Sequence, residues 1–373
     1  MRKIVFITGT RADFGKLKPL ITILEEKEDF QIHVFVTGMH LLSKYGSTVK
    51  EVERTVSATI YKYINQTSNT SMDIALSNTI VGFSNYVHEL RPDLIVVHGD
   101  RIEPFAAAIV GSLNNILVAH VEGGEISGTI DELIRHAISK LSHVHFVSND
   151  EAKKRLLSMG EELTSIFVIG SPDIEIMRSQ NLPKIVDVKE RYNIEFDRYG
   201  ILLYHPVTTE LSQLRRCIKE TVDAMIASEY NFVVIYPNND KGSDIILNEY
   251  SRLRKNKRFK ILPSMRFEFF LSLLKNANFI LGNSSAGIRE AEVYGTPTIN
   301  LGNRQKNRSL NQDIIHVSEQ KDLILSAFEQ VENLIFEPKS FFDIEEKSSE
   351  VFLKTIQSAE IWKIPYQKQF IDS

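Results

Sequence analysis

Short apolar runs alternate with longer amphipathic stretches along the first half of the chain. The longer stretches, such as Lys16–Glu26 and Asp73–Leu90, place apolar residues at helical spacing. This alternation is typical of βαβ units, in which helices cover buried parallel strands. It predicts an α/β fold whose first sheet has six or seven strands. The expected strands are Ile4–Ile7, Ile32–Val36, Leu94–Val97, Ile116–Ala119, His143–Val147 and Ile166–Ile169.

A second series of the same kind begins near residue 200, after a polar, proline-containing stretch around Gln180–Pro183. We therefore expect two Rossmann-like domains, residues 1–178 and 179–349. A helix at about 350–373, within the final stretch Glu345–Ser373, either completes the second domain or packs back on the first. The expected strands of the second domain are Ile201–Tyr204, Phe232–Tyr236, Phe259–Leu262, Phe279–Leu281 and Thr298–Leu301, and a helix is expected at Ala286–Tyr294.

Length and composition agree with two ordinary globular domains. The chain has 373 residues, of which 43% are hydrophobic and 25% are charged. Its 44 basic and 48 acidic residues give a formal net charge of -4, without the basic excess of a nucleic-acid-binding protein. The single cysteine, Cys217, excludes an internal disulfide. The apolar run at the N-terminus is too short for a signal peptide or a membrane span, so we expect a cytoplasmic protein that does not bind membranes.

Ligands of parallel α/β sheets bind outside the carboxyl ends of the strands, so residues that follow each strand carry the candidate chemistry. The first strand leads into Gly9–Lys16, which matches neither a dinucleotide fingerprint nor a Walker A loop. This turn nevertheless offers a helix N-terminus and two cations, Arg11 and Lys16, to a phosphate. The alternative is an ordinary glycine turn between a strand and a helix.

Acidic residues follow two further strands of the first domain. Asp100 follows Leu94–Val97 and Glu122 follows Ile116–Ala119, both beside glycines. Glu132 lies in the first turn of the next expected helix, where it either joins these acids or only offsets the helix dipole. Three carboxylates in one site would raise the pKa of at least one of them, which suits general acid and base catalysis.

Two histidines of the first domain have a spacing that metals can use. His143 and His145 stand two apart in a strand and so point to one face. No third ligand is placed near them by the sequence, and we predict neither a metal site nor a cofactor.

The second domain offers neutral and cationic groups at its strand ends. His205 follows the first strand, where it can face a leaving phosphate. Ser284 and Ser285 lie at the expected start of a helix, although an ordinary helix cap explains them equally well. Glu290 lies about one and a half turns into that helix, where it can accept hydrogen bonds from ribose hydroxyls. The remaining candidates are Asn238, Asn239, Gly287 and Arg304.

Eight segments occur in one order along nearly the whole chain, and together they resemble the hydrolysing UDP-N-acetylglucosamine 2-epimerases that start sialic acid biosynthesis. The resemblance implies two Rossmann-like domains facing across a cleft, the GT-B arrangement, with UDP mainly on the second. The segments are GTRADFGK, VTGMH, HGDR, HVEGGEISGTIDELIRH, YHPVTTE, YPNND, GNSSAGIREA and NLGNRQ.

The resemblance also implies roles for the candidate residues. Asp100, Glu122 and Glu132 match the catalytic acids of the family, and Arg101 and Arg135 lie beside them. The nucleotide side of the site is expected at Arg11, Lys16, His205, Asn238, Asn239, Ser284, Ser285, Gly287, Glu290 and Arg304.

The implied reaction has two stages. Anti elimination of UDP gives a 2-acetamido glucal, and syn addition of water then gives free N-acetylmannosamine. Such chemistry needs a base at the C2 proton, stabilisation of the leaving UDP, and a carboxylate that activates water. We assign Glu122 and Asp100 as the acid/base pair, Glu132 as an orienting group or second base, and His205 as the partner of the leaving group.

Several alternatives stay open from the sequence. Relatives that keep UDP attached usually have GTRPE after the first strand, whereas this chain has GTRAD and the long EGGEISGTIDE segment, which favours hydrolysis. An enzyme acting on UDP-N,N'-diacetylbacillosamine, for legionaminic acid synthesis, would show the same motifs. A GT-B glycosyltransferase and a UDP-sugar sensor without activity are weaker alternatives. The resemblance implies a homodimer or homotetramer, and the apolar segment Pro104–Val110 is either its interface or ordinary core.

Overall fold

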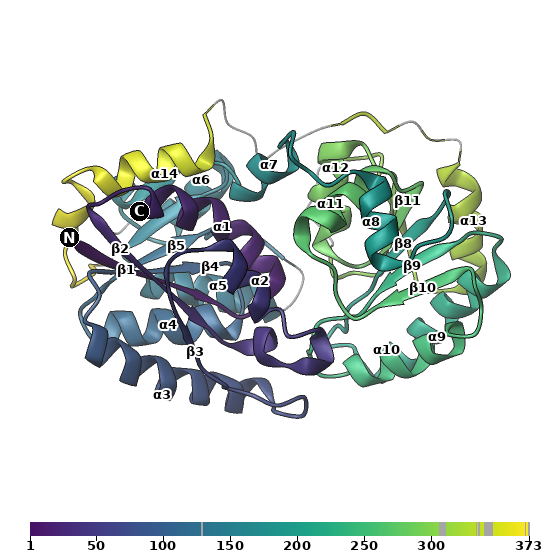
Figure 1. Ribbon diagram of the computed structural model, residues 1–373, viewed down its shortest axis with the longest axis horizontal. Coiled ribbons are helices and arrows are strands. Elements are labelled where there is room, and N and C mark those ends of the chain that lie inside the picture. Colours follow the sequence, from purple (N-terminus) through teal and green to yellow (C-terminus); the bar gives the residue numbers. More distant parts are fainter. Residues whose placement is uncertain are drawn as a thin grey trace. The chain divides into compact units, whose positions relative to one another are not determined.

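The computed structural model describes residues 1–127, 130–305, 311–332, 334, 336–338, 346–369 and 371. The chain divides into two compact units. The first contains residues 1–125, 131–178 and the described part of 341–373; the second contains 126–130 and the described part of 179–340. Each unit is a parallel sheet with helices on both faces, which is the expected Rossmann-like architecture (Figure 1).

The sheet of the first unit has seven parallel strands in the order β3-β2-β1-β4-β5-β6-β7. The order runs outward in both directions from β1 and β4, so the connections reverse direction between these two strands. Their carboxyl ends therefore form a topological switch point, where the loops diverge and leave room for a ligand. The strands are β1 (Arg2–Thr8), β2 (Phe30–Val36), β3 (Thr59–Lys62), β4 (Leu94–His98), β5 (Leu117–Val121), β6 (Val144–Val147) and β7 (Ile166–Val168).

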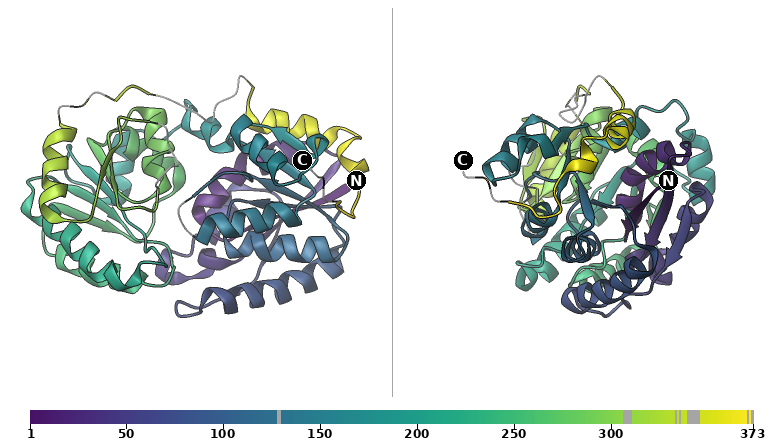
Figure 2. Two further views of the ribbon diagram at one scale, coloured as in Figure 1. Left: turned by 180° about the vertical axis from the view of Figure 1, so that it is seen from behind. Right: turned by 90° about the vertical axis from the view of Figure 1, so that its left-hand side faces the viewer.

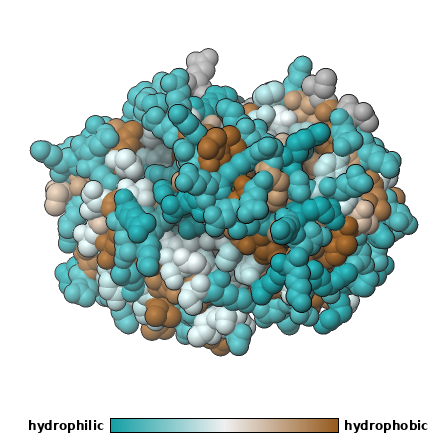
Figure 3. Space-filling view, turned by 45° about the vertical axis from the view of Figure 1, so that its right-hand side comes forward, coloured by the Kyte–Doolittle hydropathy of each residue, from teal (hydrophilic) through white to brown (hydrophobic). Residues whose placement is uncertain are grey.

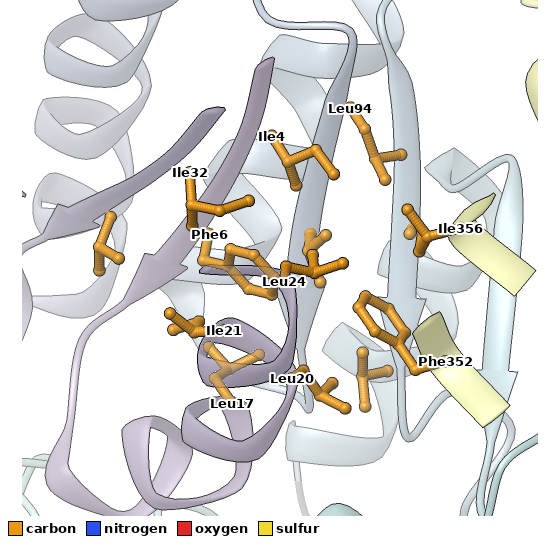
Figure 4. Close-up of a cluster of buried hydrophobic side chains, with 14 of the residues drawn as sticks. Ile4, Phe6, Leu17, Leu20, Ile21, Leu24, Ile32, Leu94, Phe352 and Ile356 are labelled. Carbon is orange, nitrogen blue, oxygen red and sulfur yellow. The ribbon is translucent and has the colours of Figure 1, made fainter. Parts of the chain in front are cut away.

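Alternate residues of β1 face two different helix layers, because side chains alternate across a strand. Ile4 and Phe6 pack with helix α1, as Figure 4 shows. Val5 and Ile7 pack with helices α3, α4 and α5 on the opposite face (Figure 2). The helices of this unit are α1 (Arg11–Glu25), α2 (Val49–Thr55), α3 (Met72–Leu90), α4 (Ile102–Leu113), α5 (Ile130–Leu141), α6 (Asp150–Ser158), α7 (Pro172–Met177) and α14 (Ser348–Gln357).

The C-terminal helix α14 packs on the first unit. Phe352 and Ile356 lie in the same buried cluster as Ile4 and Leu24 (Figure 4). The expected stretch 345–373 contains this helix and a short 3-10 turn, Ile361–Lys363; its residues 345, 370, 372 and 373 lie outside the described part. Helix α4, offered above as an interface or as core, buries residues 106–108 and Val110 inside the unit.

A cluster of charges fastens the last described segment to the sheet. The carboxylate of Glu161 is 1% exposed and receives Lys140 Nζ at 2.7 Å, Lys368 Nζ at 2.6 Å and His145 Nε2 at 2.9 Å. Burial alone would raise the pKa of Glu161, but the hydrogen bond from His145 and the two ammonium groups lower it to about 2. The Nε2 of His143 lies 2.9 Å from the carbonyl oxygen of Tyr366.

The second unit has six parallel strands in the order β10-β9-β8-β11-β12-β13, with its switch point between β8 and β11. Helices α9, α10 and α13 share one buried cluster with the sheet. The strands are β8 (Gly200–Leu203), β9 (Phe232–Ile235), β10 (Phe259–Leu262), β11 (Phe279–Gly282), β12 (Thr298–Leu301) and β13 (Ile315–Val317), and the helices are α8 (Ile185–Tyr192), α9 (Leu211–Ala227), α10 (Ser243–Tyr250), α11 (Phe267–Lys275), α12 (Glu290–Tyr294) and α13 (Lys321–Val331).

The expected helix over Ala286–Tyr294 is wrong in its first half. Residues Ser285–Gly287 form a 3-10 turn, and α12 begins only at Glu290. The hydroxyl of Thr298 donates a hydrogen bond of 2.7 Å to the carbonyl oxygen of Gly287, which draws that carbonyl toward β12. An α-helix starting at residue 286 would need this carbonyl for its own ladder.

The face of the molecule in Figure 3 is largely hydrophilic, with hydrophobic side chains in small separate patches. Within the described residues, no helix is long and apolar enough to cross a membrane.

The Glu161 cluster predicts a specific acid sensitivity. Its lowered pKa stabilises the fold fully above pH 4.5, and this contribution is lost as the pH falls toward 2. The shift corresponds to about 3 kcal/mol in the free energy of unfolding. Glu161→Gln should therefore lower stability at pH 7, and its deficit relative to wild type should shrink below pH 4.5. Urea unfolding followed by the fluorescence of Trp362, the only tryptophan, measures this.

The exposed neighbour Glu162 supplies the matched control, because Glu162→Gln removes the same charge one residue away. It should change the urea midpoint little at any pH. A deficit of Glu161→Gln that stays constant between pH 7 and pH 3 would contradict the role given to the cluster.

Candidate active site

The sequence-predicted residues lie at or beside the switch points of the two sheets. In the first unit, Arg11 follows β1, Asp100 follows β4 and Glu122 follows the adjacent β5. In the second unit, His205 follows β8 and Ser284 follows β11. The carboxyl ends of neighbouring parallel strands meet at one edge of a sheet, so each unit gathers its candidates at a single edge.

Glu122 is the most constrained acid of the first unit. It directly follows β5 with a φ of 61°, in the left-handed region that non-glycine residues rarely adopt. Its backbone N–H donates to the carbonyl of Phe146 on the next strand, which helps to hold this conformation. Such strain costs about 1–3 kcal/mol and is typical of residues held for function.

The buried carboxylate of Glu122 has close polar neighbours from three other elements. Lys16 Nζ lies 3.2 Å and 3.1 Å from its two oxygens, and the hydroxyl of Ser171 donates a hydrogen bond of 2.6 Å. His98 Nε2 lies 3.2 Å from Oε2. Lys16 also contacts Asp173 at 3.2 Å, so one ammonium group serves two buried carboxylates. An ionised carboxylate is tolerated at this depth only with such partners.

Asp100 is held by a different cation. The guanidinium of the buried Arg135, on α5, donates a hydrogen bond to the carboxylate of Asp100, whose side chain is 24% exposed. Gly99 just before it has a φ of 74°, and a Cβ placed there would meet no atom within 4 Å. The turn after β4 therefore presents a partly exposed carboxylate beside open space.

Glu132 differs from the other two acids. Its side chain is 36% exposed, and its Oε1 lies 3.8 Å from His136 Nε2, one turn along α5. Residues 128 and 129, within the predicted segment HVEGGEISGTIDELIRH, lie outside the described residues.

The turn after β1 is built as a capped helix start. Thr10 caps α1 and forms a capping box with Asp13. Arg11 forms an ion pair with Glu51 at 2.7 Å. A Cβ on Gly9 would lie 2.6 Å from the buried carboxyl carbon of Glu103, so the backbone of the turn approaches that side chain as closely as only glycine allows. Arg101 Nε lies 3.7 Å from Glu103 as well.

Asn283 joins three strand ends in the second unit. Its side chain accepts a 2.7 Å hydrogen bond from the backbone N–H of His205 and donates one of 2.8 Å to the carbonyl of the same residue. Its own carbonyl accepts from Arg304 at 3.1 Å and from Gln305 at 2.8 Å. The loops after β8, β11 and β12 are therefore fixed to one another by the side-chain amide and the backbone carbonyl of one residue.

A contact from the loop after β9 assigns the tautomer of the His205 ring. The backbone N–H of Asn238 donates to His205 Nδ1 at 3.0 Å, so Nδ1 is an acceptor and a neutral ring carries its hydrogen on Nε2. His205 is 7% exposed. A donor of this kind suits a phosphate oxygen.

Small residues and an acid follow β11. The hydroxyl of Ser284 accepts a hydrogen bond of 3.3 Å from the N–H of Ala286, and so it caps the 3-10 turn that begins at Ser285. Gly287 packs on β12, where a Cβ would lie 2.9 Å from Thr298. Glu290 is 7% exposed and is the first residue of α12, not a residue in the middle of a helix as expected. Asn239 follows Asn238 in the loop after β9.

Four residues of these networks were not expected from the sequence, namely His98, Ser171, Asp173 and Asn283. Three of them obey the strand-end rule already used, because His98 ends β4, Ser171 follows β7 and Asn283 follows β11. Asp173 could not be found by this rule, since it lies in the first turn of α7 and not at the end of a strand. His143 and His145 contact Tyr366 and Glu161, and in the described part of the chain no group of three or more metal-binding side chains occurs.

Comparison with known proteins gives one consistent result. The family model described as UDP-N-acetylglucosamine 2-epimerase matches residues 22–363. A UDP-N-acetylglucosamine 2-epimerase of Neisseria meningitidis serogroup B is 46% identical over 375 positions, which cover 100% of this chain and 99% of that protein. A hydrolysing UDP-N,N'-diacetylbacillosamine 2-epimerase of Legionella pneumophila is 35% identical over 338 positions, which cover 89% of each chain.

The fold is shared with a solved relative. The UDP-N-acetylglucosamine 2-epimerase of Methanocaldococcus jannaschii, crystallised with UDP-N-acetylglucosamine and UDP, has a TM-score of 0.82 and 24% sequence identity, covering 95% of this chain and 99% of that one. The family match spans both units and every strand-end residue described above except those of the first loop. The chain is therefore an enzyme of the UDP-N-acetylglucosamine 2-epimerase family.

Proposed function

We propose that this enzyme is the hydrolysing type of 2-epimerase, which converts UDP-N-acetylglucosamine and water to N-acetylmannosamine and UDP, the first step of sialic acid biosynthesis. The observation that carries the proposal is the pair of differently held acids on one sheet edge, Glu122 buried against Lys16 and Asp100 beside Arg135. The GTRAD sequence and the 35% identity to a relative named as hydrolysing support the hydrolytic type.

Elimination is the first stage. One carboxylate removes the C2 proton of the sugar, the C1–C2 bond becomes double, and the C1–oxygen bond breaks with its electron pair leaving on UDP. Glu122 and Asp100 are the candidate bases, and each has an adjacent cation that stabilises its ionised form. Hydration then adds the oxygen of water to C1 and returns a proton to C2 from the opposite face. Two carboxylates in different surroundings suit these two opposite proton transfers.

The leaving group is assigned to the second unit. His205 offers Nε2–H to a phosphate oxygen, and Arg304 is held beside the same loop by Asn283. Charge that develops on the departing diphosphate is then met by donors already fixed in place, which lowers the barrier more than mobile donors would. Ser284, Ser285, Asn238 and Asn239 complete the proposed nucleotide side, with Gly287 allowing close packing of the turn and Glu290 binding the ribose.

Arg11, Arg101 and Glu132 keep supporting roles in this proposal. Arg11 faces the phosphates from the first unit, and Glu132 orients a reacting group or acts as a second base. The proposed enzyme needs neither a metal nor a cofactor, works in the cytoplasm and forms a homodimer or homotetramer.

UDP-N,N'-diacetylbacillosamine is the second candidate substrate, because the Legionella pneumophila relative is named for it. Incubation of purified enzyme with each sugar nucleotide, followed by NMR of the products, distinguishes the two. We expect free UDP and N-acetylmannosamine from UDP-N-acetylglucosamine, with at least tenfold slower turnover of the bacillosamine compound. A product that still carries UDP would overturn the hydrolytic assignment.

Glu122→Gln tests the division of labour between the units. Loss of the acid/base carboxylate should lower kcat about 10²- to 10⁴-fold, while UDP affinity by calorimetry stays within about twofold because most of the proposed nucleotide residues lie in the second unit. Glu175→Gln is the matched control, since Glu175 is a partly buried acid of the first unit whose contacts are to Ser349. Normal turnover by Glu122→Gln would favour another base.

Asn283→Ala tests the nucleotide side. Loss of its two side-chain hydrogen bonds frees the His205 loop, and we expect UDP affinity to fall about tenfold, the effect of 1–2 kcal/mol. Asn231→Ala removes a comparable amide at the opposite edge of the same sheet, where Asn231 donates to the carbonyl of Arg198. Equal UDP affinities for the two variants would remove Asn283 from the nucleotide site.

A further inference from the structure

The last described segment of the chain reaches the C-terminal turn of α5. Lys368 Nζ donates to the carbonyl oxygens of Ser139 at 3.2 Å and Lys140 at 3.0 Å, while also contacting Glu161. These carbonyls belong to the last turn of α5, whose backbone acceptors have no partner within the helix. The ammonium group therefore caps α5 and opposes the negative end of its dipole.

Helix α5 also carries Arg135, the partner of Asp100. Arg135 and Ser139 are four residues apart and so lie on one face of the helix. A shift of the last turn of α5 therefore changes where the guanidinium of Arg135 sits, and with it the position of the Asp100 carboxylate.

A second chain of contacts connects the same turn of α5 to the Asp100 loop through His120. The pKa of His120 is lowered by burial to about 3, so its ring is neutral near pH 7. Nε2 lies 2.8 Å from the carbonyl oxygen of Gly99 and must carry the hydrogen, because a carbonyl only accepts. Nδ1 then accepts from the hydroxyl of Ser139 at 3.0 Å. Ser139 is thus joined to the residue that immediately precedes Asp100.

The residues along this chain of contacts are closely packed against the loop that carries Glu122. A Cβ on Gly123, the residue after Glu122, would lie 2.8 Å from His120 Nδ1 and 3.0 Å from the Ser139 hydroxyl. The loop that carries Glu122 therefore rests directly on the hydrogen bond between His120 and Ser139. Both acids of the proposed pair depend on the placement of one helical turn.

We propose that Lys368 is a positioning residue for the reaction, which acts through the last turn of α5 to hold Asp100 and Glu122 in their reactive arrangement. It contacts the last turn of α5 and acts through Ser139, His120 and Arg135. The role rests on the proposed function, because it concerns the same pair of acids.

Kinetics of three variants test the proposal in the full chain. Lys368→Met keeps most of the length of the side chain but removes the donors, and should lower kcat about tenfold or more while the KM stays within about twofold, because small misplacement of catalytic groups slows chemistry. Lys368→Arg restores a cation that can donate to the same carbonyls and should retain most of the activity. Lys363→Met is the matched control, since Lys363 lies in the same segment and pairs with Glu360 on the surface.

Hydrogen exchange gives a readout that does not depend on turnover. Lys368→Met should exchange faster in peptides covering 133–141 and 95–101, and Lys363→Met should not. Unchanged exchange together with wild-type kcat in Lys368→Met would overturn the positioning role, as would an equal loss in Lys368→Arg and Lys368→Met. If the wild type releases no UDP from either sugar nucleotide, the proposed function fails, and the exchange experiment still decides whether Lys368 holds the turns.

Discussion

The first unit depends on keeping one charged carboxylate, that of Glu122, almost out of water. A buried charge is tolerated only with close partners, and here the partners come from separate parts of the chain, Lys16 on α1 and Ser171 before α7. His98 adds a third contact from the end of β4. The strained backbone of Glu122 persists because these neighbours fix it. Two strand ends, the start of α7 and helix α1 are thereby committed to one geometry, so the carboxylate is preorganised.

The pattern of apolar runs was sufficient to predict the α/β class, because central parallel strands are buried on both faces and read as continuous apolar segments. Two strands, β3 and β13, were not predicted, because they are not buried on both faces and so lack a continuous apolar run. β3 is mostly exposed along Thr59–Lys62, and the edge strand β13 is short and alternates in exposure. Helix α12 was placed too early because the competing hydrogen bond from Thr298 to Gly287 comes from another element and leaves no local signal.

Strand ends correctly predicted which candidate residues share a sheet edge, for a topological reason. Both sheets reverse their strand order beside β1 and β8, so residues that follow central strands share an edge whatever their separation in sequence. Asp100, Glu122 and His205 were predictable on that basis. Their partners were not, because the approach of Lys16 to Glu122 or of Asn283 to His205 depends on how distant side chains pack. The contact of Arg135 with Asp100 was suggested only by family resemblance.

Proton transfer at C2 of the sugar by the pair of acids is the central claim, and solvent isotope incorporation measures it most directly. Turnover of UDP-N-acetylglucosamine in deuterium oxide, followed by NMR of the released sugar, reports the origin of the hydrogen at C2. An elimination and hydration catalysed by the acid pair predicts free N-acetylmannosamine with one deuterium at C2. A released sugar that keeps its original hydrogen at C2 would contradict the account, because the bond between C2 and that hydrogen would never have been broken.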